Sequence, residues 1–429
     1  MSKHDPKKVV ENLRNHLAAH DRPLAFLFGA GTSYSINIAP PAKPNEKRPH
    51  IPIVPDIAGL TNLCKAAIKQ LGDAFEKAWD ALEQQCTKKG KQLNIENILS
   101  QVESKVDAIG DGETLVGLTK RELEQVEKTI RQTIAKSVNM DEETIPDELP
   151  HHDFAAWVKK ITRTEPLEIF TTNYDILFEK AFEFAQIPFF DGFSGGYKPF
   201  FYSDSLEHNN LLPGPKWIRF WKIHGSVNWE IVELSGIRRV IRTQPTNTGE
   251  MIFPSYRKYD ESRKQPYTAL LDRLGQVLNQ DHALLITCGY SFSDEHINAL
   301  IFCVLNTRHT ANVISLQCED LSPTTQLVDL AKHKKNLTLI GPNAGVIGGN
   351  WGTWRLLHPV NNQTHSFMDL AFDSNAADPE AETVEDHSTE TESTSNTDSS
   401  ICSGKMQLGN FIYFCKFLNT MERGSEDEL

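Results

Sequence analysis

The chain has 429 residues, of which 39% are hydrophobic and 24% are charged, and its formal net charge is −13 at pH 7. This length and composition are typical of a folded globular protein with two or three domains. Residues 373–400 hold nine acidic residues and no Lys or Arg, so much of the charge belongs to that segment, and the pattern argues against broad, non-specific binding of nucleic acid.

The pattern of cysteines and the hydropathy of the sequence argue against several further classes of protein. The seven cysteines form no C-x-x-C pair and no close, even series, so we expect neither a zinc ribbon nor a disulfide framework. The first residues carry no apolar leader, and no run of about 18 apolar residues occurs in the sequence. We therefore expect a cytoplasmic protein with no membrane segment.

The N-terminal region predicts a helix, a strand and a glycine turn. Asp5-Pro6 is typical of a helix start, and the apolar run 24–28 leads into Gly29-Ala-Gly-Thr-Ser33. Such a turn can hold a phosphate, because glycine permits backbone angles closed to other residues and lets the backbone approach an anion. Taken alone, the pattern also fits a tight turn of any α/β protein, since the third fingerprint glycine and a Walker lysine are missing.

Residues 39–140 contain a loop and then a helical segment. Six prolines between residues 39 and 55 predict a loop over the pocket. Apolar residues at helical spacing follow, for example Leu71, Phe75 and Leu82, and a second stripe begins behind Asn94. We interpret residues 57–149 as a helical module whose stripes form its own core.

After Pro150 the pattern alternates between short apolar strands and helices. Alternation of this kind predicts an α/β fold with a doubly wound, mostly parallel, Rossmann-like sheet. We expect a core domain of residues 1–56 and 150–372, a disordered acidic linker at 373–400, and an apolar docking segment at 401–429. That last segment either packs back on the body or contacts another subunit or partner. The predicted strands are 167–172, 220–224, 283–288, 312–316 and 337–340, with helices at 176–185 and 296–305.

Polar motifs stand at the ends of these strands, where an open α/β sheet has its ligand crevice. They are Thr171-Thr-Asn-Tyr-Asp175, His224-Gly-Ser226 and Gly289-Tyr-Ser291. Each also has a simpler interpretation: Asn173 and Asp175 can cap the following helix, as can Ser291, Ser293 and Asp294, and a lone histidine is often an ordinary buried side chain.

In this order the glycine turn and the three strand-end motifs resemble the NAD-binding core of sirtuins. They are most similar to the sirtuin-like proteins of bacterial anti-phage defence. The resemblance covers about residues 24–56 and 165–345 and leaves the intervening helices outside it. It implies that NAD+ is bound at these strand ends.

The resemblance also implies roles for individual residues. Asn173 would contact the nicotinamide ribose and position the nucleophile, Asp175 would bind the carboxamide, and His224 would act on the ribose hydroxyls as a base near neutral pH. The glycine turn would hold the pyrophosphate, the Pro-Asp pair would cover the nicotinamide, and the last motif would face the adenosine. The NAD-binding candidates are Gly29, Ala30, Gly31, Ser33, Pro55, Asp56, Thr172, Gly225, Gly289, Tyr290, Ser291 and Asp294.

The chain departs from the deacylating sirtuins in the stretch where those enzymes bind zinc. Those enzymes carry a four-cysteine zinc module between the His-Gly strand and the Gly-x-Ser strand, whereas residues 227–287 contain no cysteine. We therefore expect no zinc, and an NAD+ glycohydrolase that depletes NAD+ in abortive infection. Its control would come from homo-oligomerisation or from a partner such as a HerA-type ATPase or an Argonaute, with no direct contact to nucleic acid.

Two alternatives stay open at this stage. One is a non-catalytic subunit that binds NAD+ or ADP-ribose as part of a defence complex. The other is a protein deacylase or ADP-ribosyltransferase, which the missing cysteines disfavour. Nicotinamide release from NAD+ without any acyl peptide distinguishes the glycohydrolase from both.

Overall fold

The computed structural model describes residues 2–41, 46, 48–88, 93–234, 236–246, 251, 265–357, 365–376 and 403–421. The chain forms two compact units, and each is built from separate stretches of sequence. Unit 1 consists of Met1–Leu27, Pro150–Leu167 and Val277–Leu429, and unit 2 consists of Phe28–Leu149 and Glu168–Gln276.

Unit 1 contains a mostly parallel sheet with the strand order β1-β16-β15-β14-β13-β12-β2. The pairs β12–β13, β13–β14 and β1–β16 are parallel, whereas β14–β15 and β15–β16 are antiparallel. The residues of β2 and β12 are all buried, as expected for strands covered on both faces. The strands are β1 (Ser2–His4), β2 (Leu24–Phe28, whose last residue is counted with unit 2), β12 (Leu284–Cys288), β13 (Asn312–Leu316), β14 (Leu337–Ile340), β15 (Ala344–Ile347) and β16 (Asn350–Trp354).

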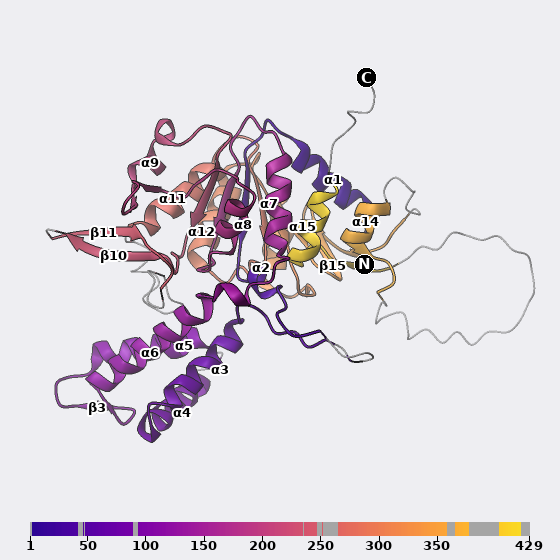
Figure 1. The fold of residues 1–429 in the computed structure, drawn as a ribbon. Coiled ribbons are helices and arrows are strands. Elements are labelled where there is room, and N and C mark those ends of the chain that lie inside the picture. The colour runs from indigo at the N-terminus through magenta and orange to yellow at the C-terminus, as the bar shows by residue number, and fades with distance from the viewer. Residues whose placement is uncertain are drawn as a thin grey trace, which may run out of the picture. The chain divides into compact units, whose positions relative to one another are not determined.

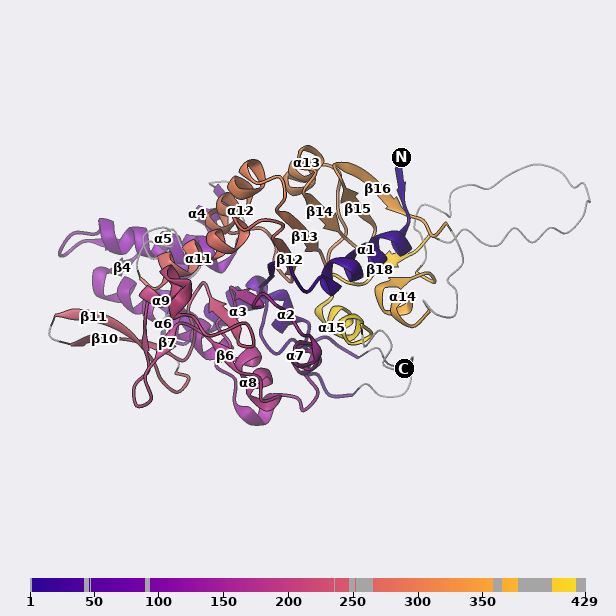
Figure 2. The ribbon, with the colours of Figure 1, turned by 90° about the horizontal axis from the view of Figure 1, so that it is seen from above.

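Helices cover both faces of this sheet, as Figure 2 shows. On one face lie α12 (Glu295–Thr307) and α13 (Gln326–His333), and on the other lie α1 (Pro6–Ala18), α14 (His365–Ala371) and α15 (Phe411–Asn419). Helix α7 (Pro150–Lys160) packs against α15. At this contact the ring of Phe26 on β2 lies 5.4 Å from Phe154 and 6.3 Å from Phe414, so the C-terminal helix is part of the core.

The described part of the C-terminal segment, residues 403–421, therefore packs in cis within unit 1. Strand β17 (Phe372–Asp373) pairs with β18 (Lys405–Met406), and α15 follows with its buried apolar face on α7. Disorder was predicted for residues 373–400. Of these, residues 377–400 lie outside the described residues, and Asp373 belongs to β17.

Unit 2 holds the strands β5 (Glu168–Thr171), β9 (Ile218–Lys222) and β6 (Phe189–Phe190), which pair in parallel. A second sheet has the order β10-β11-β8-β7. Figure 1 shows β10 (Trp229–Leu234) and β11 (Ile237–Arg242) as a long hairpin, which the sequence analysis did not predict. Further elements are α2 (Gly31–Tyr34), α8 (Leu177–Phe184), α9 (Asp204–Glu207), α11 (Tyr267–Leu278, whose last two residues are counted with unit 1), β7 (Phe193–Ser194), β8 (Phe200–Phe201), and the 3-10 helices Glu142–Thr144 and Asn209–Leu211.

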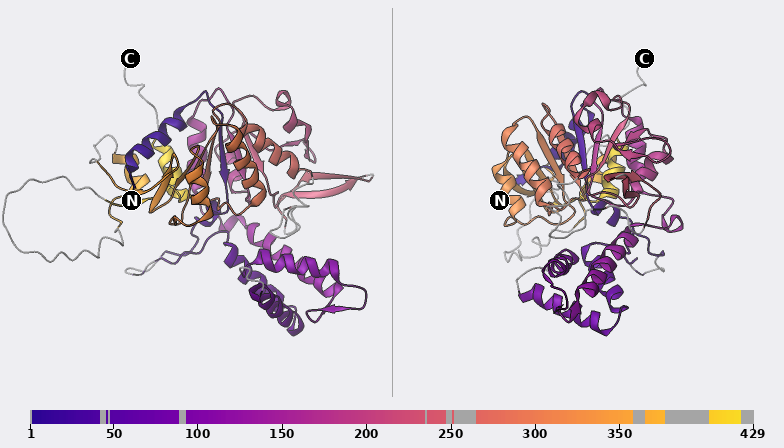
Figure 3. Two further views of the ribbon diagram at one scale, coloured as in Figure 1. Left: turned by 180° about the vertical axis from the view of Figure 1, so that it is seen from behind. Right: turned by 90° about the vertical axis from the view of Figure 1, so that its left-hand side faces the viewer.

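The helical segment of unit 2 forms a bundle, and its four main helices lie alongside one another (Figure 3). Their buried apolar residues form one cluster that also contains Ile36, Val54, Leu177, Val227 and Met251. The bundle is therefore packed on the residues that follow the strands of unit 2. Its elements are α3 (Ile57–Lys69), α4 (Asp73–Lys88), α5 (Ile95–Ala108), β3 (Thr114–Leu115), β4 (Leu118–Thr119) and α6 (Lys120–Val138).

The observed architecture confirms the predicted α/β, mostly parallel, Rossmann-like fold. Strands β13 and β14 have the predicted bounds, while β9 ends at Lys222, two residues earlier than predicted. The division into a core domain and a helical module stays a prediction, since unit 2 contains the helices together with part of the sheet. Across the described residues, no helix is both long enough and apolar enough to span a bilayer.

Candidate functional site

The glycine turn follows β2 and bends directly into helix α2. The amide and the hydroxyl of Thr32 both donate to the carbonyl of Gly29, at 3.0 and 2.9 Å, and Ala30 has helical angles, φ −54° and ψ −27°. Neither Gly29 nor Gly31 has a positive φ, so the expectation of left-handed backbone angles in this turn is wrong. The other reason for glycine, a close approach of the backbone to a ligand, stays a prediction.

Asn173 joins the second motif to the glycine turn. Its Nδ2 donates to Oγ1 of Thr32 and to Oγ of Ser33, both at 2.9 Å. The hydroxyl of Ser33 in turn donates to Oδ2 of Asp175 at 2.7 Å, and the amide of Thr172 donates to the carbonyl of Phe28. Thr32, Ser33, Asn173 and Asp175 are all buried. The glycine turn and the Asn173 motif therefore belong to one hydrogen-bond network.

The side chain of Asn173 keeps one acceptor unused. Its Oδ1 is buried and has no hydrogen-bond partner among the residues that the structure describes, and the residue is only 5% exposed. A buried carbonyl oxygen without a donor costs about 1–3 kcal/mol, and such groups in native proteins call for a specific explanation. A ligand hydroxyl or a water that donates to Oδ1 would remove this cost.

Asp175 supports two elements at once. Its Oδ2 accepts from Ser33, while its Oδ1 accepts from the amide of Leu177, the first residue of α8, at 3.1 Å. The N-cap position of α8 is Ile176, so Asp175 supports the start of the helix from the residue before its cap. Asn173 instead directs its side chain to the glycine turn, and its own amide donates to the hydroxyl of Thr171.

The His-Gly motif meets the same segment after β9. The amides of Ile223 and Val227 donate to the carbonyls of Thr171 and Tyr174, at 2.9 and 3.1 Å. His224 is 8% exposed, and its ring centroid lies 6.4 Å from that of Tyr174. Gly225 has φ +86°, a conformation that favours glycine and turns the chain after the histidine.

Lys222 is a site residue that the sequence analysis missed. This lysine is 2% exposed, and its Nζ donates to the carbonyls of Tyr174 and Asp175 and to Oε1 of Glu179 at 2.8 Å. Burial raises the pKa of Glu179, and the Lys222 ammonium opposes that shift. Lys222 thus fixes the backbone of the Asn173 segment. Its position inside the predicted strand 220–224 was the available signal, because a lysine is rarely fully buried unless it is paired.

The Pro55-Asp56 pair lies at the start of helix α3. The Oδ1 of Asp56 accepts from the amide of Gly59 at 2.7 Å, which makes Asp56 the helix cap. The preceding residue, Val54, belongs to the apolar cluster that contains Leu177 and Val227. The pair is thereby connected to the residues that follow β5 and β9.

The fourth motif belongs to unit 1 and follows β12. Gly289 has φ +65°, and the hydroxyl of Tyr290 donates to Asn298 at 2.9 Å. Burial, together with the nearby charge of Asp294, raises the pKa of Tyr290. Asp294 caps α12 because its side chain accepts from the amides of His296 and Ile297. Ser291 shares a hydrogen bond with Ser293.

A cavity of about 250 Å³ lies beside this motif, at the carboxyl ends of β13 and β14. Gln317 forms part of its wall and donates to the carbonyl of Tyr290 at 3.3 Å. The C-terminal segment supplies the opposite wall through Gln407, Asn410 and Tyr413. An aromatic ring beside amide groups is suited to a nucleoside.

The structure therefore brings three of the four predicted motifs together within unit 2, and the fourth lies in unit 1. Residues 167–340 match a family model described as a SIR2-like domain. This range contains the three strand-end motifs, and the glycine turn lies before it. A search of the curated proteins finds no match. Within the described parts of the chain, no group of three or more His, Cys, Asp or Glu side chains is arranged to hold a metal ion.

Proposed function

From the SIR2-like domain at residues 167–340, which indicates NAD-related activity, we infer that this protein is an NAD+ glycohydrolase. It cleaves NAD+ to nicotinamide and ADP-ribose. The observation that carries the proposal is the buried Asn173. Two hydroxyls of the glycine turn hold it by its Nδ2, while its Oδ1 has no donor within the described part of the chain.

The reaction requires a small number of polar contacts. The bond between the nicotinamide nitrogen and C1′ of the ribose breaks, and the ribose develops oxocarbenium character. Nicotinamide leaves as a neutral molecule because its ring nitrogen is cationic in NAD+. The oxygen of a water forms the new bond to C1′, and the water gives up a proton. The site must therefore hold the sugar and one water in line.

Asn173 and His224 supply these contacts in the proposal. The Oδ1 of Asn173 accepts a hydrogen bond from the attacking water or from a ribose hydroxyl, and His224 takes up the proton. Asp175 binds the carboxamide, since each carboxylate oxygen can accept a second hydrogen bond beside those from Ser33 and Leu177. The backbone of Gly29, Ala30 and Gly31 holds the pyrophosphate, as the resemblance implies.

Water, and not an acyl-lysine, is the proposed acceptor of the ribosyl group. The stretch between the His-Gly and Gly-x-Ser motifs contains no cysteine and holds the β10–β11 hairpin and helix α11. The absence of cysteine from this stretch supports a site without the zinc module of the deacylases. The adenosine end of NAD+ would lie by Gly289 and Ser291.

Nicotinamide release from NAD+ by the purified full-length chain tests the proposal. We expect Asn173→Ala and His224→Ala to lower the rate by about 100-fold or more, since a group that orients the reactants and a positioned general base each contribute on that scale. Asn210→Ala and His208→Ala are matched controls at exposed positions and should keep the wild-type rate. If the chain binds NAD+ tightly and releases no nicotinamide under any condition, the non-catalytic alternative replaces the glycohydrolase.

The biological role and the control of the activity are part of the same proposal. A constitutive NADase would deplete the NAD+ of its host, so an off state is required. We propose that the enzyme acts in abortive-infection defence and is controlled by homo-oligomerisation or by a partner such as a HerA-type ATPase. The test is the NAD+ content of infected cells that carry the gene with its neighbours. NAD+ that stays constant, with Asn173→Ala cells equally resistant, contradicts this role.

A further inference from the structure

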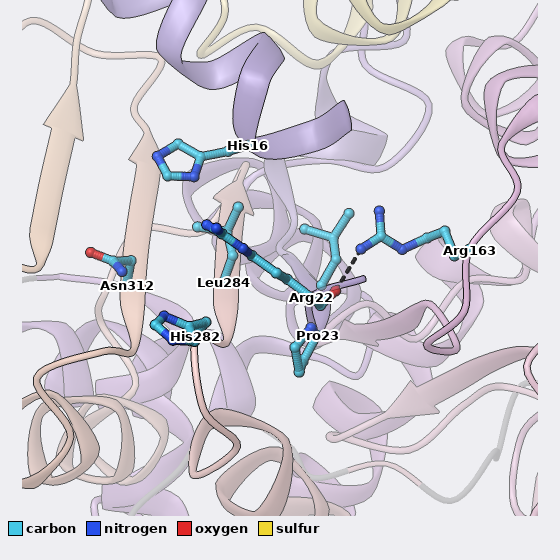
Figure 4. Close-up of a pocket in the computed structure, with 8 residues that line it drawn as sticks. His16, Arg22, Pro23, Arg163, His282, Leu284 and Asn312 are labelled. Carbon is cyan, nitrogen blue, oxygen red and sulfur yellow. Dashed lines mark hydrogen bonds between the residues drawn. The ribbon is translucent and has the colours of Figure 1, made fainter. Parts of the chain in front are cut away.

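A small pocket lies in unit 1 at the amino ends of β2, β12 and β13, and Figure 4 shows it in close-up. The pocket holds about 30 Å³, which is room for about two water molecules. The first residues of the three strands, Leu24, Leu284 and Asn312, form its floor. It is lined by His16, Arg22, Pro23, Leu24, Arg163, His282, Leu284 and Asn312.

The lining contains four basic side chains and no carboxylate. They come from places far apart in the sequence: helix α1, the loop before β2, the loop after α7 and the start of β12. In Figure 4 the side chain of Arg22 extends toward His16, and His282 and Asn312 lie on the same side of the pocket. A concentration of positive charge stands out in a chain whose formal net charge is −13.

The guanidinium of Arg22 is not neutralised. Throughout the residues that the structure describes, it takes part in no hydrogen bond or ion pair, although its carbonyl accepts from Arg163. Burial lowers the pKa of His16, and the positive charge of Arg22 lowers it further. Both effects disfavour the protonated form of His16, and no carboxylate lines the pocket to offset them.

Arg163 holds the loop that carries Arg22. Its Nη2 donates to the carbonyls of Ala19 and Arg22, at 2.9 and 2.6 Å. The acidic groups Asp21 and Glu165 act on the charge of Arg163, and neither of them lines the pocket. The loop is therefore fixed while the head group of Arg22 stays available.

We propose that this pocket binds the phosphoryl group of a small phosphate-bearing anion. Arg22 supplies the planar pair of donors that matches phosphate oxygens, and the imidazoles of His16 and His282 supply further N–H donors. Because the pocket has room for only about two water molecules, oxygens of the phosphoryl group enter it and the rest of the ligand stays outside. Strand β12 separates the pocket from Gly289 by five residues, about 16 Å along the strand. Binding here consequently does not compete with the adenosine end of NAD+.

Calorimetric titration of the purified chain with inorganic phosphate tests the proposal, and it does not depend on NAD+ cleavage. We expect saturable binding that Arg22→Gln weakens by about tenfold or more, because a charge-assisted hydrogen bond contributes about 1.5–3 kcal/mol. Lys335→Gln removes the same charge from an exposed position of unit 1 and should leave the affinity unchanged. A parallel titration with AMP identifies the source: tighter binding of AMP that also needs Arg22 indicates a nucleotide, and equal binding indicates free phosphate.

A measurement on the wild-type chain covers the case in which a variant fails to fold. In a histidine NMR titration, phosphate should shift the imidazole signals of His16 and His282 and raise the pKa of His16, because an anion stabilises the protonated ring. The absence of saturable binding up to about 10 mM phosphate overturns the proposal. Equal affinity in Arg22→Gln and Lys335→Gln, or unmoved signals of both histidines, overturns it as well.

Discussion

His151 should make the stability of unit 1 sensitive to mild acid. This histidine lies on α7 with 0% of its surface exposed, and its ring contacts Phe411 of α15 edge to face, with centroids 5.0 Å apart. Burial, with a smaller contribution from the charge of His152, lowers the pKa of His151 from 6.5 to about 3. The folded protein thus keeps this ring neutral at pH values where the unfolded chain protonates it.

The sign and size of the effect follow from this difference. Because the pKa is depressed in the folded state, the contribution to stability is complete above pH 6.5 and is lost as the pH falls from 6.5 toward 3. Each pH unit in that window costs about 1.4 kcal/mol, so a change from about pH 7 to about pH 5 should cost about 2 kcal/mol.

Urea unfolding at the two pH values measures this loss. We expect His151→Leu to lose about 2 kcal/mol less than the wild type between about pH 7 and about pH 5. Each protein is compared with itself at the two pH values, so the effect of the substitution on packing, which is present at both, cancels from the change in the free energy of unfolding. His309→Gln, an exposed histidine of the same unit, is the control and should behave as the wild type does. An identical acid loss in the wild type and His151→Leu would refute the reasoning.

Two further predictions concern buried contacts. Lys222→Met should destabilise the protein by about 3–5 kcal/mol, because it leaves Glu179 buried without its cation, and the added substitution Glu179→Gln should restore part of the loss in a double-mutant cycle of urea unfolding. Gly409→Ala should cost about 1–3 kcal/mol and speed the proteolysis of the C-terminal segment, since its Cβ would lie 1.9 Å from the carbonyl oxygen of Gln317. Gly196→Ala, with nothing within 4 Å of the new Cβ, is the control, and equal proteolysis rates would contradict the second prediction.

The parts of the fold that the sequence predicted are those with a strong local pattern. Strands β2, β12, β13 and β14 are short apolar runs bounded by turns, and parallel strands buried on both faces give that signal. Helix α5 starts behind Asn94, whose side chain caps it. The hairpin β10–β11 was missed because charged residues such as Arg238 and Arg239 interrupt its apolar residues. Its stability depends on pairing across the hairpin, which a single segment does not reveal.

For the candidate site, too, the sequence indicated the residues of local motifs and missed those whose contacts are distant in the chain. The rule that ligands bind at the carboxyl ends of parallel strands selected Asn173, Asp175 and His224; the first two share one network with Ser33, and His224 lies beside Tyr174 of the same segment, while their functional roles stay predictions. It could not select Thr32 or Lys222, because their importance comes from contacts with residues about 140 and 47 positions away. Such contacts exist only once the chain has folded, so the place of Thr32 in the glycine turn and of Lys222 in a predicted strand did not by itself reveal their importance.

The hydrogen bonds around Asn173 also determine which way its amide points. Thr32 uses its single hydroxyl hydrogen on the carbonyl of Gly29, and Ser33 uses its own on Oδ2 of Asp175. Both hydroxyls can therefore only accept a bond from Asn173, and only Nδ2 can donate one. A flipped amide would set three acceptors against one another and lose both bonds. The network thus fixes Oδ1 on the opposite side, where none of the described residues donates to it, before any ligand arrives. An aspartate at this position has no donor for the two hydroxyls, so Asn173→Asp cannot preserve the arrangement although it preserves the shape of the side chain.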